Sequence, residues 1–208
     1  MREHPIPPVT ERLQYRAIGI VRGVYKPENP DQLTRGHVLD ADGNALEAVV
    51  LGRVMTLMRR HIEMSRPHLW VVYPRCRSAD QLHLQIAGIW EPSTLLRLDS
   101  EQVDVTSSAD SGEGALDTLP EGDDYFSIRG ELIFTRPETN DFVIKVRQKP
   151  KQNGSNPPPF KLQLKGNIPL EHIRYFVSTE IRRQGQALHL ENYEVISQVT
   201  SRRGKRRK

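Results

Sequence analysis

Four short patterns in the first half of the chain return in the second half, in the same order. The pairs are Val21-Arg22-Gly23 with Ile128-Arg129-Gly130, Leu51-Gly52 with Lys165-Gly166, His61-Ile62 with His172-Ile173, and Leu82-His83-Leu84 with Leu188-His189-Leu190. Their separations all fall between 106 and 114 residues. One such match carries no weight, but four in one order at one period predict two copies of a single module.

Each copy reads as β-strands around one short helical segment. The predicted strands cover residues 14–25, 36–39, 46–51, 68–75 and 82–90 in the first copy, and 125–135, 142–148, 160–165, 176–183 and 187–196 in the second. A helix is expected over 55–63, and a helical turn over 170–175. Gly23 and Gly130 interrupt the two first strands, where glycine lets a strand bend around a barrel corner and pair on both sides.

This order, β-β-β-α-β-β with a glycine in a long first strand, resembles the OB-fold. The resemblance covers about 15–97 and 125–197, and it implies an all-β protein with short helices: two OB-like five-stranded Greek-key barrels in tandem. A single larger β domain is the alternative. The run 13–23, together with 68–75, also looks like a conserved cyanobacterial protein, and that second resemblance carries no activity with it.

Charge divides the chain into further segments. Residues 98–124 hold nine Asp or Glu and no Lys, Arg or aromatic residue, which is typical of a flexible linker. The segment 202–208 holds six cations in seven residues. We therefore expect an N-terminal extension (1–12), a first barrel (13–97), an acidic linker (98–124), a second barrel (125–199) and a basic disordered tail (200–208).

The usual marks of an enzyme are missing from the sequence. There is no phosphate-loop Gly-Lys-Ser/Thr, no His-Glu-x-x-His and no Gly-x-Ser-x-Gly, and Cys76 is the one cysteine. We expect no catalysis, no cofactor and no bound metal. No run approaches the ~18 apolar residues of a membrane helix, and no secretory leader is recognisable. A cytoplasmic protein is expected, with association with the nucleoid as an option.

The second copy carries the strongest binding signal. Because successive side chains of a strand point to opposite faces, its polar residues are predicted to lie outside the barrel. That outward set is Arg129, Lys145, Arg147, Lys149, Lys161, Gln163 and Lys165, with no acidic residue expected on its second and third strands. In OB barrels this face binds single-stranded nucleic acid or oligosaccharide.

The expected ligand is therefore single-stranded RNA or DNA, held through its phosphates. The basic tail would add contacts from Arg202, Arg203, Lys205, Arg206, Arg207 and Lys208. Because the predicted face lacks the aromatic platforms on which bases stack, we expect weak, salt-sensitive binding. A further hypothesis is that the acidic linker folds back on the tail or the basic face and competes with nucleic acid there.

The first copy supports a different reading. Its third strand places Val49 and Leu51 outward, while Trp70 and Tyr73 fall on opposite faces of the fourth strand. These four residues form the candidate docking surface of an assembly adaptor with a protein partner, which is the alternative function.

Overall fold

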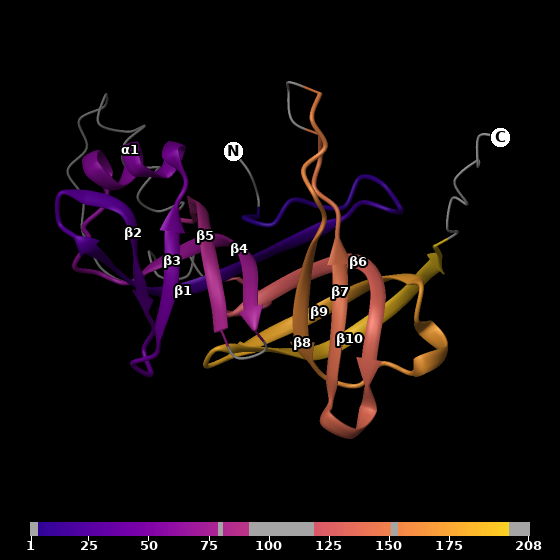
Figure 1. Ribbon diagram of the computed structural model, residues 1–208. Helices are drawn as coiled ribbons and strands as arrows, with labels where there is room; N and C mark the ends of the chain where they lie inside the picture. The colour runs from indigo at the N-terminus through magenta and orange to yellow at the C-terminus, as the bar shows by residue number, and fades with distance from the viewer. Residues whose placement is uncertain (1–3, 79–80, 92–118, 151–153, 200–208) are drawn as a thin grey trace. The chain divides into compact units, whose positions relative to one another are not determined.

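The computed structural model describes residues 4–78, 81–91, 119–150 and 154–199. Within them the chain forms two compact units, and each contains one β-barrel (Figure 1). The acidic stretch 98–118 and the basic tail 200–208 lie outside the described residues. No helix in the described ranges is long and apolar enough to cross a membrane.

Barrel 1 is built from five strands and one helix. In chain order these are β1 (Arg16–Asn29), β2 (Gln32–Leu39), β3 (Ala45–Val50), α1 (Gly52–His61), β4 (His68–Ser78) and β5 (Gln81–Ile89). The strands are hydrogen-bonded in the order β1-β2-β3-β5-β4, and β4 pairs again with β1. This pairing closes the sheet, with β3 and β5 parallel and the other printed pairs antiparallel.

Barrel 2 repeats the same topology. Its elements are β6 (Tyr125–Arg136), the 3-10 turn η1 (Pro137–Thr139), β7 (Asp141–Val146), β8 (Phe160–Lys165), the 3-10 turn η2 (Leu170–His172), β9 (Tyr175–Gln184) and β10 (Ala187–Gln198). The order β6-β7-β8-β10-β9 closes through β6 and β9. The predicted all-β tandem of OB-fold barrels is therefore confirmed.

A glycine marks the corner of the first strand in each barrel. Gly23 is the last residue of β1 that pairs with β4, and Val24 is the first that pairs with β2. A Cβ on Gly23 would lie 2.4 Å from the carbonyl oxygen of Leu39, and one on Gly130 would lie 2.5 Å from that of Lys145. Glycine is required here because the neighbouring backbone occupies the space of a side chain.

The inward faces of the strands fill both barrels with apolar side chains. Tyr25 and Trp70 are almost completely buried in barrel 1, where the Trp70 indole Nε1 donates to the Gly23 carbonyl at 2.9 Å. Phe126, Phe142 and Ile144 are equally buried in barrel 2. Alternation along each strand thus fixes which side chains enter the core and which are left outside.

Segments from outside the strands cover part of each outer surface. In the first unit, Ile6 and Leu119 belong to a cluster with Ile18 and Ile20 of β1.

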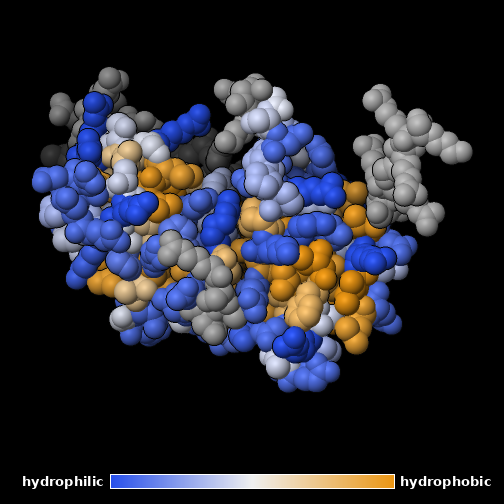
Figure 2. Space-filling view, in the orientation of Figure 1, coloured by the Kyte–Doolittle hydropathy of each residue, from blue (hydrophilic) through white to orange (hydrophobic). Residues whose placement is uncertain are grey.

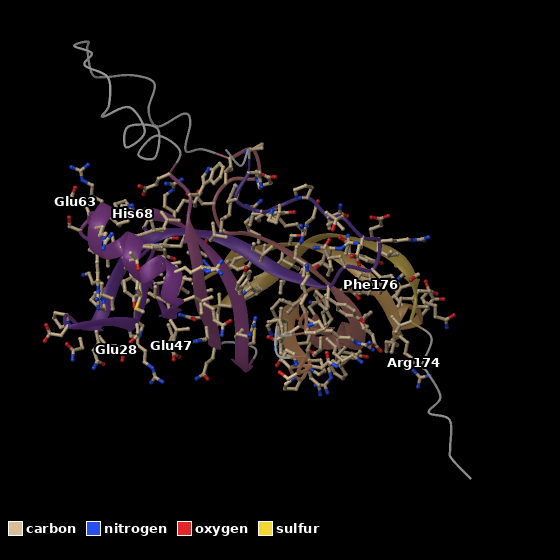
Figure 3. The ribbon with its side chains drawn as sticks, turned by 90° about the horizontal axis from the view of Figure 1, so that it is seen from above. Glu28, Glu47, Glu63, His68, Arg174 and Phe176 are labelled. Atoms are coloured by element: carbon tan, nitrogen blue, oxygen red, sulfur yellow. The ribbon has the colours of Figure 1, made fainter. Side chains whose placement is uncertain are left out.

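In the second unit, the segment Pro8–Ala17, here called the strap, leads into β1. It packs the Tyr15 ring edge-on against Phe176 of β9, which Figure 3 labels, with ring centroids 5.0 Å apart. The first and fourth strands are covered in this way. The outer faces of the second and third strands hold half-buried and exposed side chains.

Candidate nucleic-acid interface

The outer face of β6, β7 and β8 carries three rows of side chains, because paired residues of neighbouring strands point to the same side of a sheet. The rows are Glu131–Lys145–Lys161, Phe134–Val143–Gln163 and Arg136–Asp141–Lys165. We call this surface the strand face. Three of its nine side chains are aliphatic, aromatic or amide, and six are charged. Figure 2 shows hydrophobic residues over β6 and β7 bordered by hydrophilic ones.

Two lysines of the strand face form ion pairs with neighbouring carboxylates. Lys145 Nζ lies 2.5 Å from Glu131 Oε2, and Lys165 Nζ lies 2.8 Å from Asp141 Oδ1. Hydrogen bonds from Lys165 and Thr139 hold the pKa of Asp141 below its usual range. The expectation of an outward set without acidic residues is wrong, because β7 begins one residue earlier than predicted and Asp141 joins that set.

Three predicted cations lie in exposed positions. Lys161, Arg147 and Lys149 are all exposed. Lys161 stands directly opposite Lys145 in the register of β7 and β8. Their ammonium and guanidinium groups are therefore accessible to solvent.

Arg129 was predicted on the outer surface, yet it is only 7% exposed. Its guanidinium donates to the carbonyl oxygens of Arg12 at 2.7 Å and Gln14 at 3.3 Å, and to Ser178 Oγ at 2.9 Å. Burial lowers the pKa of Arg129. The prediction of Arg129 as a ligand-facing residue is wrong: it does point outward from β6, but the strap covers it.

The sequence reasoning missed Phe134, an aromatic residue on β6 in the middle row of the strand face. The register between β6 and β7 shifts between Leu132 and Phe134, so Ile133 is an extra residue in β6. Such a bulge redirects the residues that follow it. Phe134 is consequently 38% exposed, with the Arg136 guanidinium 5.4 Å from its ring centroid. The expected strand face without an aromatic side chain is therefore corrected: it carries the exposed Phe134 ring.

The remaining predicted residues of barrel 2 lie at the margins of this face. Gln163 is half-buried, and its carbonyl oxygen accepts from the Cys76 thiol at 3.7 Å. Burial raises the pKa of Cys76, which opposes a thiolate at neutral pH. Lys149 lies in the connection between β7 and β8, where Gln148 Nε2 donates to the Pro158 carbonyl at 3.1 Å. The predicted tail residues, from Arg202 to Lys208, lie outside the described ranges.

Strands β10 and β9 extend the row Arg136–Asp141–Lys165 of the strand face. His189 of β10 pairs with Lys165, and Arg182 of β9 pairs with His189. Arg182 Nε lies 2.9 Å from Glu191 Oε1. Basic side chains thus continue from β8 to β9, again with a carboxylate beside them.

The predicted docking residues of barrel 1 do not form one surface. Trp70 is completely buried, so its assignment to a docking surface is wrong; it faces inward and packs edge-on against Tyr25. Tyr73 is 37% exposed, and Leu51, which follows β3, is 38% exposed. Val49 is half-buried opposite Arg35.

Barrel 1 also holds a buried histidine, His68, whose ring packs edge-on against Trp70 with the ring centroids 5.6 Å apart. His68 is buried, its Nδ1 contacts the Glu91 carboxylate, and its Nε2 lies 2.8 Å from the Glu63 carbonyl oxygen (Figure 3). Burial lowers the pKa of His68, but the hydrogen bonds to Glu91 and Glu63 outweigh it, so the pKa is raised. Both ring nitrogens are occupied, and the side chain ties the segment after α1 to the end of β5. Among the described residues, no group of three or more His, Cys, Asp or Glu side chains is placed to hold a metal ion.

Comparison with known families assigns both halves of the chain. Residues 17–97 match the N-terminal OB-fold domain of the PatR RNA-binding protein, and residues 128–197 match a cyanobacterial C-terminal OB-fold-like RNA-binding domain. No curated protein matches the chain. The two matched ranges coincide with the two barrels and together cover well over half of the sequence, so the chain is a tandem of two OB-fold domains, each similar to the domain family whose model it matches.

Proposed function

We propose that this protein binds single-stranded RNA without chemical change, through the strand face of barrel 2. Both matched families are described as RNA-binding, which supports nucleic-acid binding as the general activity. The observation that carries the finer proposal is the arrangement of the strand face, where the exposed Phe134 ring lies one row from the facing lysines Lys145 and Lys161.

The dimensions of the strand face suit an extended nucleic-acid strand. Neighbouring strands lie about 4.8 Å apart, and same-face residues of one strand about 6.6 Å apart. Lys161, Lys145 and Lys165 are thereby spaced to meet successive phosphates, while a base stacks on Phe134. A stacked base contributes about 1–3 kcal/mol, with little dependence on its identity.

The ion pairs of the strand face limit its affinity. A phosphate that approaches Lys145 or Lys165 competes with Glu131 or Asp141 for the same ammonium group. Each phosphate contact on a single strand contributes about −0.7 to the slope of log K against log salt. We therefore expect modest affinity that falls steeply as salt rises.

The basic tail supplies the second part of the proposed interface. Its six cations, Arg202, Arg203, Lys205, Arg206, Arg207 and Lys208, contact phosphates without reading sequence. Deletion of 202–208 should lower the affinity and the salt slope together. The ratio between single-strand and duplex binding should stay as it is, since a run of cations reads charge alone.

Fluorescence anisotropy with a labelled single-stranded RNA, its DNA counterpart and an RNA duplex, at several salt concentrations, tests the proposal. The variant Lys145→Ser/Lys161→Ser should weaken binding and reduce the slope by about 1.4. The matched control, Arg59→Ser/Arg60→Ser, removes two exposed cations from α1 and should change little. Equal losses in the two variants, or tight binding of the duplex alone, would contradict the strand-face proposal.

Protein docking through barrel 1 is the alternative function. The exposed Leu51 and Leu57, 38% and 42% accessible, favour it. A pull-down with and without nuclease separates the two: a partner that survives nuclease and is lost in Leu51→Ser/Leu57→Ser supports the adaptor, whereas loss of all partners after nuclease supports RNA binding.

A further inference from the structure

Four side chains of the second unit form a continuous stack that runs from the interior to the surface. The Arg129 guanidinium carbon lies 5.8 Å from the centroid of the Phe176 ring. Phe176 meets Tyr15 edge-on at 5.0 Å, and the Arg147 guanidinium carbon lies 5.5 Å from the Tyr15 centroid. Arg129 and Phe176 are buried, Tyr15 is half-buried and Arg147 is exposed. The stack therefore ends at the surface in a guanidinium group.

The strap that supplies Tyr15 is held at several points. Arg129 donates to two of its carbonyl groups, those of Arg12 and Gln14. Arg16 Nη2 donates to Ser127 Oγ at 2.6 Å, and Arg12 Nη2 donates to the Ile196 carbonyl at 2.8 Å. Tyr15 lies between these anchors. Its ring is thus fixed against β9, and it offers the Arg147 side chain a constant partner.

Arg147 lies directly beyond the strand face. It follows the last residue of β7 and is two residues from Lys145, so its side chain points to the same side of that strand as Lys145. A cation held against an aromatic ring is oriented as well as attracted. The planar guanidinium group also offers a flat surface on which nucleobases stack in single-stranded RNA.

We infer that Arg147, backed by Tyr15 of the strap, is a second nucleobase platform, on which a base stacks against the guanidinium plane. This inference rests on the proposed RNA binding and deepens it, because the residue that orients the platform comes from outside the OB barrel. Arg147 acts through its shape here, in addition to the charge that it shares with the lysines.

The two platforms, Phe134 and Arg147, lie on either side of Lys145 along the direction of β7. Phe134 is level with Val143, and Arg147 is four residues further along β7, a distance of about 13 Å. This distance is about four times the 3.4 Å rise of one nucleotide in a duplex strand. Bases on the two platforms are therefore not stacked on each other, and the strand between them passes Lys145 and Lys161 in an extended form.

The test uses the full chain and a single-stranded RNA that carries 2-aminopurine, whose fluorescence is quenched by stacking, with affinity measured at several salt concentrations. Arg147→Lys keeps the charge and loses the plane, so we expect affinity to fall about five-fold or more, reduced quenching, and an unchanged salt slope. Tyr15→Leu should act in the same direction, while Tyr15→Phe keeps the ring and restores wild-type behaviour. Lys161→Ser is the matched control, which should lower the slope by about 0.7 and keep the quenching.

Wild-type affinity and quenching in Arg147→Lys would overturn the inference and leave the strand-face proposal in place, because charge alone would then account for Arg147. Wild-type protein that fails to bind the RNA at low salt would overturn both. Equal binding by Tyr15→Leu and wild type would overturn the role of the strap. Arg147 is exposed, so its replacement leaves the fold intact, and thermal melting of the Tyr15 variants checks theirs.

Discussion

The two barrels share a scaffold and differ in what they present on the second and third strands. The corner glycines align them, since Gly23 approaches the carbonyl oxygen of Leu39 and Gly130 approaches that of Lys145. Leu39 pairs with Ala45 in barrel 1, and at the same place Lys145 pairs with Lys161 in barrel 2. Equivalent positions on the second and third strands thus hold an apolar pair in barrel 1 and a cationic pair in barrel 2.

The next row of the two faces also differs. Barrel 1 places His37 opposite Glu47, whereas barrel 2 places Val143 opposite Gln163 and adds Phe134 from β6. Inward residues and corner glycines determine the barrel, and in both copies the inward residues are mainly apolar and the glycine stands at the corner. Outward residues are free of that constraint, so a duplicated module can acquire a binding face in one copy alone.

The largest expected effect concerns the shared scaffold. Gly23→Ala and Gly130→Ala place a methyl group against a backbone oxygen that cannot move alone, so each should destabilise its own barrel by about 3 kcal/mol. Both tryptophans, Trp70 and Trp90, belong to barrel 1. During urea unfolding, Gly23→Ala should move the tryptophan fluorescence transition to lower urea. Gly130→Ala should leave that transition in place and move part of the circular dichroism transition to lower urea.

Gly52→Ala is the control for these variants, because a Cβ at Gly52 meets nothing within 4 Å. Its free energy of unfolding should stay close to that of wild type. Near-neutral effects of Gly23→Ala and Gly130→Ala would show that the corner is not as tight as the two carbonyl contacts require.

A smaller difference is expected between the arginines that precede the two glycines. Arg129 is buried and holds the strap, whereas Arg22 pairs with Asp123 at 2.6 Å with about a third of its side chain exposed. Arg129→Met removes the buried guanidinium that donates to the carbonyl groups of Arg12 and Gln14, so it should cost about 2 kcal/mol of stability. Arg22→Met should cost less than about 1 kcal/mol, as exposed ion pairs do.

Urea unfolding of the two variants measures this difference, with Arg147→Met as an exposed control on barrel 2. If Arg22→Met destabilises as much as Arg129→Met, burial of the second arginine under the strap is not what makes it structurally important.

The smallest effect concerns the ion pair between Asp141 and Lys165. The pKa of Asp141 is lowered, so its contribution to stability is complete above its ordinary pKa of 3.8 and is lost as pH falls through the lowered value. Asp141→Asn should flatten the decline in stability below about pH 4. At neutral pH it removes the Asp141 carboxylate that competes with phosphate for Lys165, so RNA affinity should rise about two-fold. Thermal melts across pH measure the change in stability, and an RNA titration at pH 7 measures the change in affinity. A lower affinity of Asp141→Asn than of wild type would contradict the competition between phosphate and carboxylate.

Strand positions could be predicted from the sequence because alternation and glycine placement are local signals. The third strand of the second copy has its predicted bounds, Phe160–Lys165, and the other nine predicted strands differ from the observed ones by one to four residues at their ends. The outward positions of Lys145, Lys161 and Lys165 followed from the same alternation. Helix α1 begins three residues earlier than expected, at Gly52.

The features that the sequence did not predict depend mainly on contacts between distant parts of the chain. The bulge at Ile133, which turns Phe134 outward, is a property of the register with β7 and leaves no mark in the β6 sequence. The burial of Arg129 depends on the strap, more than a hundred residues earlier in the chain. Asp141 illustrates a third cause, because a one-residue error at the start of a strand adds a charge to its outer face.

A reciprocal exchange of the pair that distinguishes the barrels tests the central claim most directly. The variant Lys145→Leu/Lys161→Ala gives barrel 2 the pair of barrel 1, and Leu39→Lys/Ala45→Lys does the reverse. Single-stranded RNA binding, measured by anisotropy between low and high salt, should weaken in the first variant with a slope reduced by about 1.4. The second, made in that weakened background, should recover part of the affinity at low salt. Unchanged affinity and slope in Lys145→Leu/Lys161→Ala would contradict the account.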